Sequence, residues 1–228
     1  MPVQILSDPQ IIQPYLSDES KVTGQAESIS FPECEAEIRE VLFAVRQAHQ
    51  TLTVQGARTG ITGGAVPTGG HILNLSKLNR ITGMGWDAER NCFLLSVQPG
   101  MQLNQLNKAI AEKSFDTTGW SAQAQSALRR FQQSGAWFLS ADITETTASI
   151  GGMVSTNASG AKSYRYGSMR QHVLGLRLLL ANGKSLSLNR GEQFAQGRQL
   201  SLRLDDGILH KRAECLGLCT RPKSPAAS

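Results

Sequence analysis

Two glycine-rich segments of this 228-residue sequence have residue types that can hold a large anionic ligand. The first, Gln55–Gly70, directly follows a short apolar stretch. Its glycines permit positive φ and lack the Cβ that would keep backbone N–H groups away from a ligand. Successive exposed N–H groups form an anion nest, to which threonine hydroxyls add donors and an arginine adds charge, so a diphosphate is the natural occupant. The residues expected to hold it are Gly56, Ala57, Arg58, Thr59, Gly60, Thr62, Gly63 and Gly64.

Two familiar phosphate-binding loops do not fit the spacing of this segment. A nicotinamide dinucleotide fold has G-x-G-x-x-G at the start of a helix. Here Gly60-Ile-Thr-Gly-Gly lacks that order, and Val66-Pro67 blocks an immediate helix. The Walker pattern G-x-x-x-x-G-K-[ST] is absent. The remaining alternative is a glycine-rich turn that only connects two strands.

The second segment, Ser149–Gly160, combines apolar and small residues. Ile150, Met153 and Val154 can face a core, while the small residues leave another face bare for the close approach of a ligand. Its asparagine can donate and accept hydrogen bonds, which suits a ribose or the edge of a flavin. The alternative is close helix packing by small residues. The expected ligand contacts here are Gly151, Gly152, Asn157 and Gly160.

Hydrophobic spacing predicts the elements that must position these segments. An amphipathic helix is expected over 33–49 and another over 101–112, and residues 119–136 are expected at the surface, helical around 128–133. Strands are expected at 52–55, 71–75, 81–86, 92–97, 173–180 and 185–189, the last two joined by an Asn182-Gly183 hairpin turn. We interpret the chain as a mixed α/β protein of two lobes that divide near residue 90.

Composition argues against several classes of protein. The net charge is +5, but the basic residues are scattered and do not form the stripe typical of a nucleic-acid protein. The 4 cysteines have neither zinc spacing nor a disulfide framework, so we expect no metal site and a reducing, cytoplasmic compartment. No stretch reaches the ~20 apolar residues of a membrane helix. We therefore expect a soluble protein that meets a membrane only through a partner.

The two segments together resemble the FAD loops of the p-cresol methylhydroxylase and vanillyl-alcohol oxidase superfamily. Gly56-Ala-Arg-Thr-Gly-Ile-Thr-Gly-Gly-Ala-Val-Pro resembles the first loop, and Ile150-Gly-Gly-Met-Val-Ser-Thr-Asn-Ala-Ser-Gly resembles the second. Gln98-Pro-Gly100 resembles the turn between them, and Asn182-Gly183 the closing hairpin. Order and spacing agree over about residues 28–190. Within the superfamily, the chain is most similar to glycolate oxidase flavoprotein subunits and D-lactate dehydrogenases.

This resemblance implies an α+β fold of two subdomains with FAD extended between them. The expected organisation is a lead-in at 1–27, an FAD-binding domain at 28–204 with subdomains of about 28–90 and 91–204, and an irregular tail at 205–228. Full members of the superfamily continue into a cap domain, which supplies a substrate-binding arginine and catalytic histidines. The resemblance therefore assigns no catalytic residue to this sequence.

The resemblance also assigns roles in binding FAD. The first loop would hold the diphosphate, and the second segment would contact the ribityl chain, the phosphates or the ribose. Pro99 and Gly100 would form the turn between the loops, and the backbone of Val173 would meet the adenine. Asp142 and Thr144 would lie along the flavin, although Ala-Asp-Ile stands where the superfamily often has Pro-Asp-Pro.

Ile61 stands where members with a covalent flavin carry a histidine, which implies noncovalent FAD. The implied activity is oxidation of a small 2-hydroxy acid, such as glycolate or D-lactate, by hydride transfer to FAD. A cap-containing or iron–sulfur partner subunit would complete such an enzyme. His49 and His172 are candidate bases by residue type alone. Two alternatives stay open: an electron-transfer module or inactive truncated fragment that binds flavin without turnover, and a phosphate-binding domain without flavin.

Overall fold

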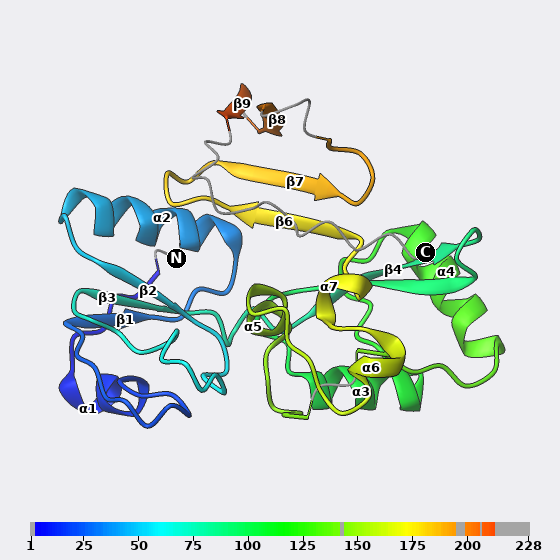
Figure 1. The fold of residues 1–228 in the computed structure, drawn as a ribbon, viewed down its shortest axis with the longest axis horizontal. Coiled ribbons are helices and arrows are strands. Elements are labelled where there is room, and N and C mark those ends of the chain that lie inside the picture. The colour runs from blue at the N-terminus through cyan, green and yellow to red at the C-terminus, as the bar shows by residue number, and fades with distance from the viewer. Residues whose placement is uncertain (1–2, 142–143, 195–198, 206, 213–228) are drawn as a thin grey trace, which may run out of the picture. The chain divides into compact units, whose positions relative to one another are not determined.

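The computed structural model describes residues 3–141, 144–194, 199–205 and 207–212. The chain forms two compact units, Met1–His172 and Val173–Ser228. The first unit contains both helices and strands, whereas the described elements of the second are all strands (Figure 1). The mixed α+β class expected from the sequence is therefore confirmed. The expected subdomain boundaries near residues 28, 90 and 204 stay predictions.

A three-stranded parallel sheet begins the first unit, with β3 between the other two strands. Every residue of this central strand is buried. The helix α2 (Glu35–Gln47) packs Val41 and Val45 against Leu73 of β3, as its apolar spacing requires. The three strands are β1 (Ser28–Ser30), β2 (Leu52–Gln55) and β3 (His71–Asn74). The first glycine loop begins where β2 ends.

The N-terminal residues form part of this core. A short helix, α1 (Pro9–Ile12), and a 3-10 turn, η1 (Gln13–Tyr15), precede β1. Ile12 packs with Ile29 and Ile72 in a fully apolar cluster. The apolar spacing of the lead-in at 1–27 indicates a helix only weakly, because four-residue elements are too short to display a period.

An antiparallel hairpin and two helices follow the sheet. The elements are β4 (Ile81–Asp87), β5 (Cys92–Val97), α3 (Leu103–Glu112) and α4 (Ala122–Gln133). α4 packs on β4, and its Phe131 meets Phe93 of β5 edge-on at a ring-centroid distance of 5.1 Å. The helix expected around 128–133 is thus confirmed and begins earlier, at Ala122, and its apolar face covers the hairpin. The unit closes with α5 (Ile150–Ser155), α6 (Ser163–Tyr166) and α7 (Met169–His172).

The second unit contains an antiparallel sheet of four strands in the order β6-β7-β8-β9. The strands are β6 (Gly175–Leu179), β7 (Ser185–Asn189), β8 (Gln199–Leu204) and β9 (Gly207–Arg212). Gly183, with φ at 82°, turns the chain between β6 and β7, which confirms the expected hairpin. The expectation of an irregular tail from residue 205 is wrong for β9, whose strand is established by pairing with β8. Residues 213–228 lie outside the described residues.

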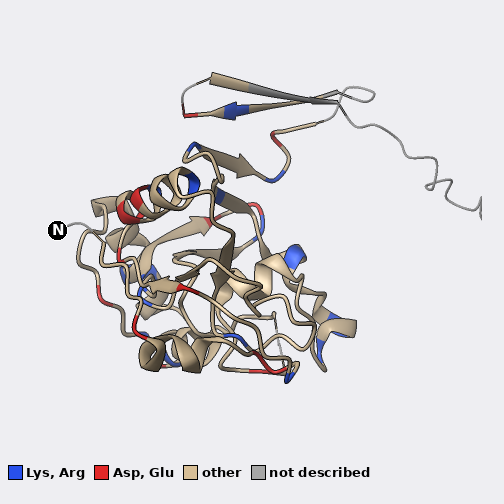
Figure 2. Ribbon diagram, turned by 90° about the vertical axis from the view of Figure 1, so that its left-hand side faces the viewer, with Lys and Arg blue, Asp and Glu red and all other residues tan. Residues whose placement is uncertain are grey.

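Charged residues are distributed along the chain. Figure 2 shows Lys and Arg positions spread over many elements and interspersed with Asp and Glu. Several form exposed ion pairs, such as Lys21 with Glu19 at 2.6 Å and Lys77 with Glu33 at 2.7 Å. Exposed pairs of this kind contribute little to stability.

Candidate functional site

The first glycine loop presents a run of unused backbone donors. Among the described residues, none accepts a hydrogen bond from the N–H groups of residues 58–64. A Cβ built on Gly60 or Gly64 would meet no atom within 4 Å, so the space beside them is open. Gly63 and Arg58 have φ at 74° and 60°, the left-handed conformation that lets successive N–H groups converge. The loop therefore combines unused donors and open space with left-handed residues, a conformation that also occurs in anion nests.

Buried polar side chains fix the far end of this loop. Gln55, with 0% of its surface exposed, donates its Nε2 to the carbonyl of Ala65 at 2.8 Å and to the carbonyl of Tyr15 at 2.8 Å. Asp18 accepts from the N–H of Ala65 at 3.3 Å and from the N–H of Ser20 at 2.9 Å. Burial works against the charge of Asp18, but the hydrogen bonds from Ser20 and Ala65 outweigh it and hold the pKa of this carboxyl below its usual range.

Arg58 takes part in the loop through its backbone, while its side chain contacts the N-terminal segment. Its guanidinium donates to the carbonyl of Pro14 and lies 4.6 Å from the ring centre of Tyr15. In this conformation the positive charge expected to assist the nest is engaged with the N-terminal segment. Of the two threonines expected as donors, Thr62 is exposed and Thr59 half-buried.

The structure brings the turn between the loops against the second segment. The carbonyl of Pro99 accepts from the N–H of Gly151 at 2.8 Å, and a Cβ on Gly151 would lie 2.6 Å from the Cβ of Pro99. Gly100 is buried, and a Cβ there would lie 2.0 Å from the carbonyl oxygen of Leu75. Close packing thus requires both glycines. For Gly151 this supports the alternative interpretation of the second segment, in which small residues allow close packing of a helix.

The second segment uses most of its polar groups internally. The N–H groups of Ile150, Gly151 and Gly152 are all bonded, so the start of α5 leaves none of these donors free. Asn157, with φ at 48°, accepts from the N–H of Arg170 at 2.9 Å and so ties this segment to α7. Gly152 and Asn157 remain exposed, and Gly160 is half-buried. Their contacts with FAD stay predictions.

The other predicted contacts are placed as follows. Asp142 lies outside the described residues, and Thr144 is exposed. Val173 begins the second unit, where its carbonyl accepts from Nε of Arg190 at 3.0 Å. The predicted roles of these three residues are therefore untested by the geometry.

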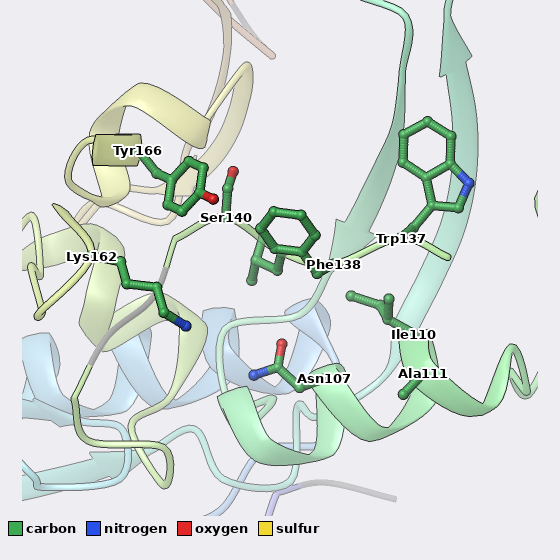
Figure 3. A pocket seen from close by; sticks show the side chains of 9 residues that line it. Asn107, Ile110, Ala111, Trp137, Phe138, Ser140, Lys162 and Tyr166 are labelled. Carbon is green, nitrogen blue, oxygen red and sulfur yellow. The ribbon is translucent and has the colours of Figure 1, made fainter. Parts of the chain in front are cut away.

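A cavity of about 230 Å³ lies between α3, residues 137–140 and α6. Figure 3 shows the side chains of Asn107 and Lys162 directed toward this space. Phe138 and Tyr166 stand edge to face at one side, with ring centroids 5.7 Å apart. The full lining is Asn107, Ile110, Ala111, Trp137, Phe138, Leu139, Ser140, Lys162 and Tyr166. Residues 137–140 of this lining precede Asp142 and Thr144 in the chain, and Lys162 follows Gly160. Asp142, Thr144 and Gly160 were all expected beside FAD.

His172 is hydrogen-bonded to a residue of this cavity. Its Nδ1 lies 3.2 Å from Oγ of Ser140, while its Nε2 is buried and has no partner among the described residues. No pattern in the sequence distinguishes this histidine from His49. The described residues contain no cluster of three or more His, Cys, Asp or Glu side chains that could hold a metal ion.

Comparison with known proteins identifies the family. A family model described as an FAD binding domain matches residues 26–128 and 121–189. The chain belongs to this family. Its cofactor is therefore FAD, and the unused N–H groups and open space of the first loop fit the diphosphate of that cofactor. The two matched segments overlap within α4.

Curated relatives include dehydrogenases of hydroxy acids. The chain is 30% identical over 190 residues to a D-lactate dehydrogenase of Anaerostipes hadrus. The aligned residues make up 82% of this chain and 34% of the relative. The chain is 27% identical over 190 residues to the mitochondrial D-2-hydroxyglutarate dehydrogenase of Danio rerio, covering 82% of this chain and 31% of the relative. The chain thus spans about a third of the length of the relatives it matches.

Solved structures share the fold at low identity. An alkyldihydroxyacetonephosphate synthase structure covers 84% of this chain, and this chain covers 33% of it, with a TM-score of 0.61 at 16% identity. The BBE-like 1 protein of Physcomitrella patens has a TM-score of 0.60 at 14% identity, with coverages of 83% and 36%. These matches confirm the α+β fold expected from the resemblance. Among the described residues, no helix combines the length and apolar character needed to span a membrane.

Proposed function

We propose that this chain is the FAD-binding part of an oxidoreductase that oxidises a small 2-hydroxy acid. The observation that carries the proposal is the run of unused N–H groups at residues 58–64, in a chain whose family binds FAD. The named activities of its relatives on D-lactate and D-2-hydroxyglutarate support the substrate class. Bound FAD would supply the acceptor for the hydride that leaves the α-carbon of the substrate.

The chain's own contribution is to bind and orient the cofactor. The backbone donors of residues 58–64 would hold the diphosphate, and their geometry is already set by the buried Gln55 and Asp18. Because Ile61 offers no nucleophile and is 78% exposed, the cofactor would be held without a covalent bond. The cavity beside α3 would exclude water from an apolar part of a ligand through Phe138 and Tyr166, and Asn107 and Lys162 would supply polar contacts.

The test is the visible absorption spectrum of the purified chain after incubation with FAD and desalting. We expect flavin bands that survive desalting, and release of all flavin into the supernatant when the protein is precipitated with acid. A chain that stays colourless and shows no affinity for FAD by calorimetry would contradict cofactor binding. Flavin fluorescence that remains with the denatured polypeptide would contradict noncovalent binding.

A second candidate is a flavin-binding module that has no turnover of its own. The observation that favours it is that the lining of the described cavity contains neither a histidine nor a carboxylate that could act as a base. In that case a cap-containing or iron–sulfur partner would complete the active site. A cytoplasmic location, or a peripheral one at a membrane through such a partner, belongs to the same proposal, and the free Cys34 and Cys92 are consistent with a reducing compartment.

A further inference from the structure

Ser149 joins the two glycine segments, which are far apart in the sequence. Its Oγ accepts from the N–H of Ala57, in the first loop, at 3.3 Å. The same oxygen accepts from the N–H of Gly152, in α5, at 3.3 Å. A hydroxyl oxygen has two acceptor positions, so one atom can serve both segments. Ser149 is only 3% exposed, which shields these bonds from competition with water.

Gly56 shows how closely the two segments approach each other at this point. A Cβ on Gly56 would lie 2.1 Å from Oγ of Ser149 and 3.3 Å from its Cβ. No other heavy atom of the described residues lies within 4 Å of that position, apart from chain neighbours. Because φ of Gly56 is outside the left-handed region, backbone strain does not explain the glycine. The space of its missing side chain is taken by the hydroxyl of Ser149.

The bond to Ala57 completes the support of the first loop. At the other end, Ala65 is held by Gln55 and Asp18 through its carbonyl and its N–H. The unused donors of residues 58–64 lie between these two fixed points. Donors that are fixed before a ligand arrives bind it more tightly, because less conformational freedom is lost on binding.

We propose that Ser149 is a positioning residue for FAD, which holds the start of the diphosphate loop against α5 and so fixes the two FAD segments relative to each other. The proposal rests on the proposed function of the loop as the diphosphate site. Ser149 acts through the backbone of Ala57, since its buried oxygen is already engaged by two N–H groups. Its loss should therefore change cofactor affinity through the geometry of the loop.

The experiment is a double-mutant cycle on Ser149→Ala and Gly56→Ala, with the FAD dissociation constant measured by calorimetry. We expect Ser149→Ala to bind FAD about tenfold more weakly, as loss of one hydrogen bond predicts. Gly56→Ala should also bind FAD more weakly, because its methyl group displaces the hydroxyl of Ser149. The double variant should bind about as well as Ser149→Ala alone, because removing the hydroxyl also removes the 2.1 Å clash. Additive losses, or unchanged affinity of Ser149→Ala, would overturn the proposal.

Ser121→Ala provides a matched control. Ser121 begins α4 as Ser149 begins α5, and its Oγ accepts from the N–H of Ala124 at 3.2 Å. Both variants lose a helix cap, and each should lower the melting temperature of the apo chain by about 2–4 °C. Only Ser149→Ala should weaken FAD binding. Equal affinities of the two variants would mean that Ser149 is a cap and nothing more.

Amide hydrogen exchange in the chain without FAD separates this proposal from the proposed function. We expect the Ala57 N–H to exchange faster in Ser149→Ala than in the wild type, and at an unchanged rate in Ser121→Ala. Unchanged exchange at Ala57 in Ser149→Ala would overturn the positioning role even if FAD binds. A wild-type chain that does not bind FAD would instead contradict the proposed function, and the exchange rates would still decide whether Ser149 holds the loop.

Discussion

At the scale of single residues, Gly64 separates cofactor contact from protein stability. Its φ lies outside the left-handed region, unlike that of Gly63, and a Cβ there would meet nothing within 4 Å. Gly64→Val should therefore change the unfolding free energy of the apo chain by less than ~0.5 kcal/mol. It should weaken FAD binding by several kcal/mol, because the branched side chain fills space that the ligand needs, whereas Thr62→Ala should cost only ~1 kcal/mol.

Gly135→Val is the control for that substitution, since Gly135 also has open space and an ordinary φ but lies outside the first loop. Calorimetric titration of both variants with FAD gives the comparison. If Gly64→Val and Gly135→Val bind FAD equally well, the first loop does not hold the diphosphate.

His71 makes stability depend on pH. Its ring is 1% exposed, and its two nitrogens each lie 2.8 Å from a serine hydroxyl of β1, Ser28 and Ser30. Burial lowers the pKa of His71 to about 4. The unfolded chain, with a histidine pKa near ~6.5, takes up this proton more readily than the folded chain. The contribution of His71 is therefore fully present above pH ~6.5 and is lost as pH falls toward about 4, by ~3 kcal/mol in all.

Urea unfolding of the apo chain at pH 7 and pH 4.5 measures this loss. In His71→Gln the loss should be smaller, because glutamine can bond both serines and carries no titrating group. Carboxyl groups such as Asp18 titrate in both proteins, so the comparison isolates the histidine. The same pH dependence in both proteins would show that His71 is not the responsible group.

At the scale of elements, the N-terminal segment supports the first loop. Gly24 donates its N–H to the carbonyl of Leu16 at 2.8 Å, and a Cβ on Gly24 would lie 1.9 Å from the carbonyl oxygen of Pro67. The position of a Cβ is fixed by the backbone of residue 24, and the oxygen belongs to the backbone of Pro67. The chain itself must therefore shift to accept a methyl group at residue 24. Gly24→Ala should therefore lower the unfolding free energy by ~1–3 kcal/mol and weaken FAD binding, because Val66-Pro67 closes the first loop.

Gly135→Ala, with open space around its Cβ, is the matched variant for this element. Chemical denaturation and FAD titration are measured on both proteins. Wild-type stability in Gly24→Ala would mean that the N-terminal segment does not pack against Pro67 in solution.

The sequence predicted the elements with a clear period and missed those fixed by distant contacts. The apolar spacing of α2 and the Asn182-Gly183 turn are local signals, and both are confirmed. The support of the first loop is not local: Gln55 bonds Tyr15, 40 residues away, and Ala57 bonds Ser149, 92 residues away. No pattern along the chain shows that Asp18 or Ser149 would reach the loop. The contacts that surround the glycines at 56, 100 and 151 also come from distant parts of the chain. These glycines were therefore predicted to contact the ligand, although close packing requires each of them.

At the scale of the whole molecule, turnover needs more than a bound flavin. The α-hydrogen of the substrate must be held close to the ring, a base must take the hydroxyl proton, and a cation must hold the carboxylate. Lys162 is the positively charged residue in the lining of the described cavity. His172 does not line this cavity and contacts it through its hydrogen bond with Ser140.

We therefore expect the FAD-loaded chain alone to oxidise 2-hydroxy acids very slowly. A displacement of ~1 Å in a reacting group costs about a hundredfold in rate, and an incomplete site should cost more. The measurement is anaerobic mixing with D-lactate, D-2-hydroxyglutarate or glycolate while the flavin absorption band is followed. Dithionite, which reduces flavin without a substrate site, should bleach the band at once and shows that the bound flavin is competent. Rapid bleaching by any of the three acids would show that residues of this chain alone complete the active site.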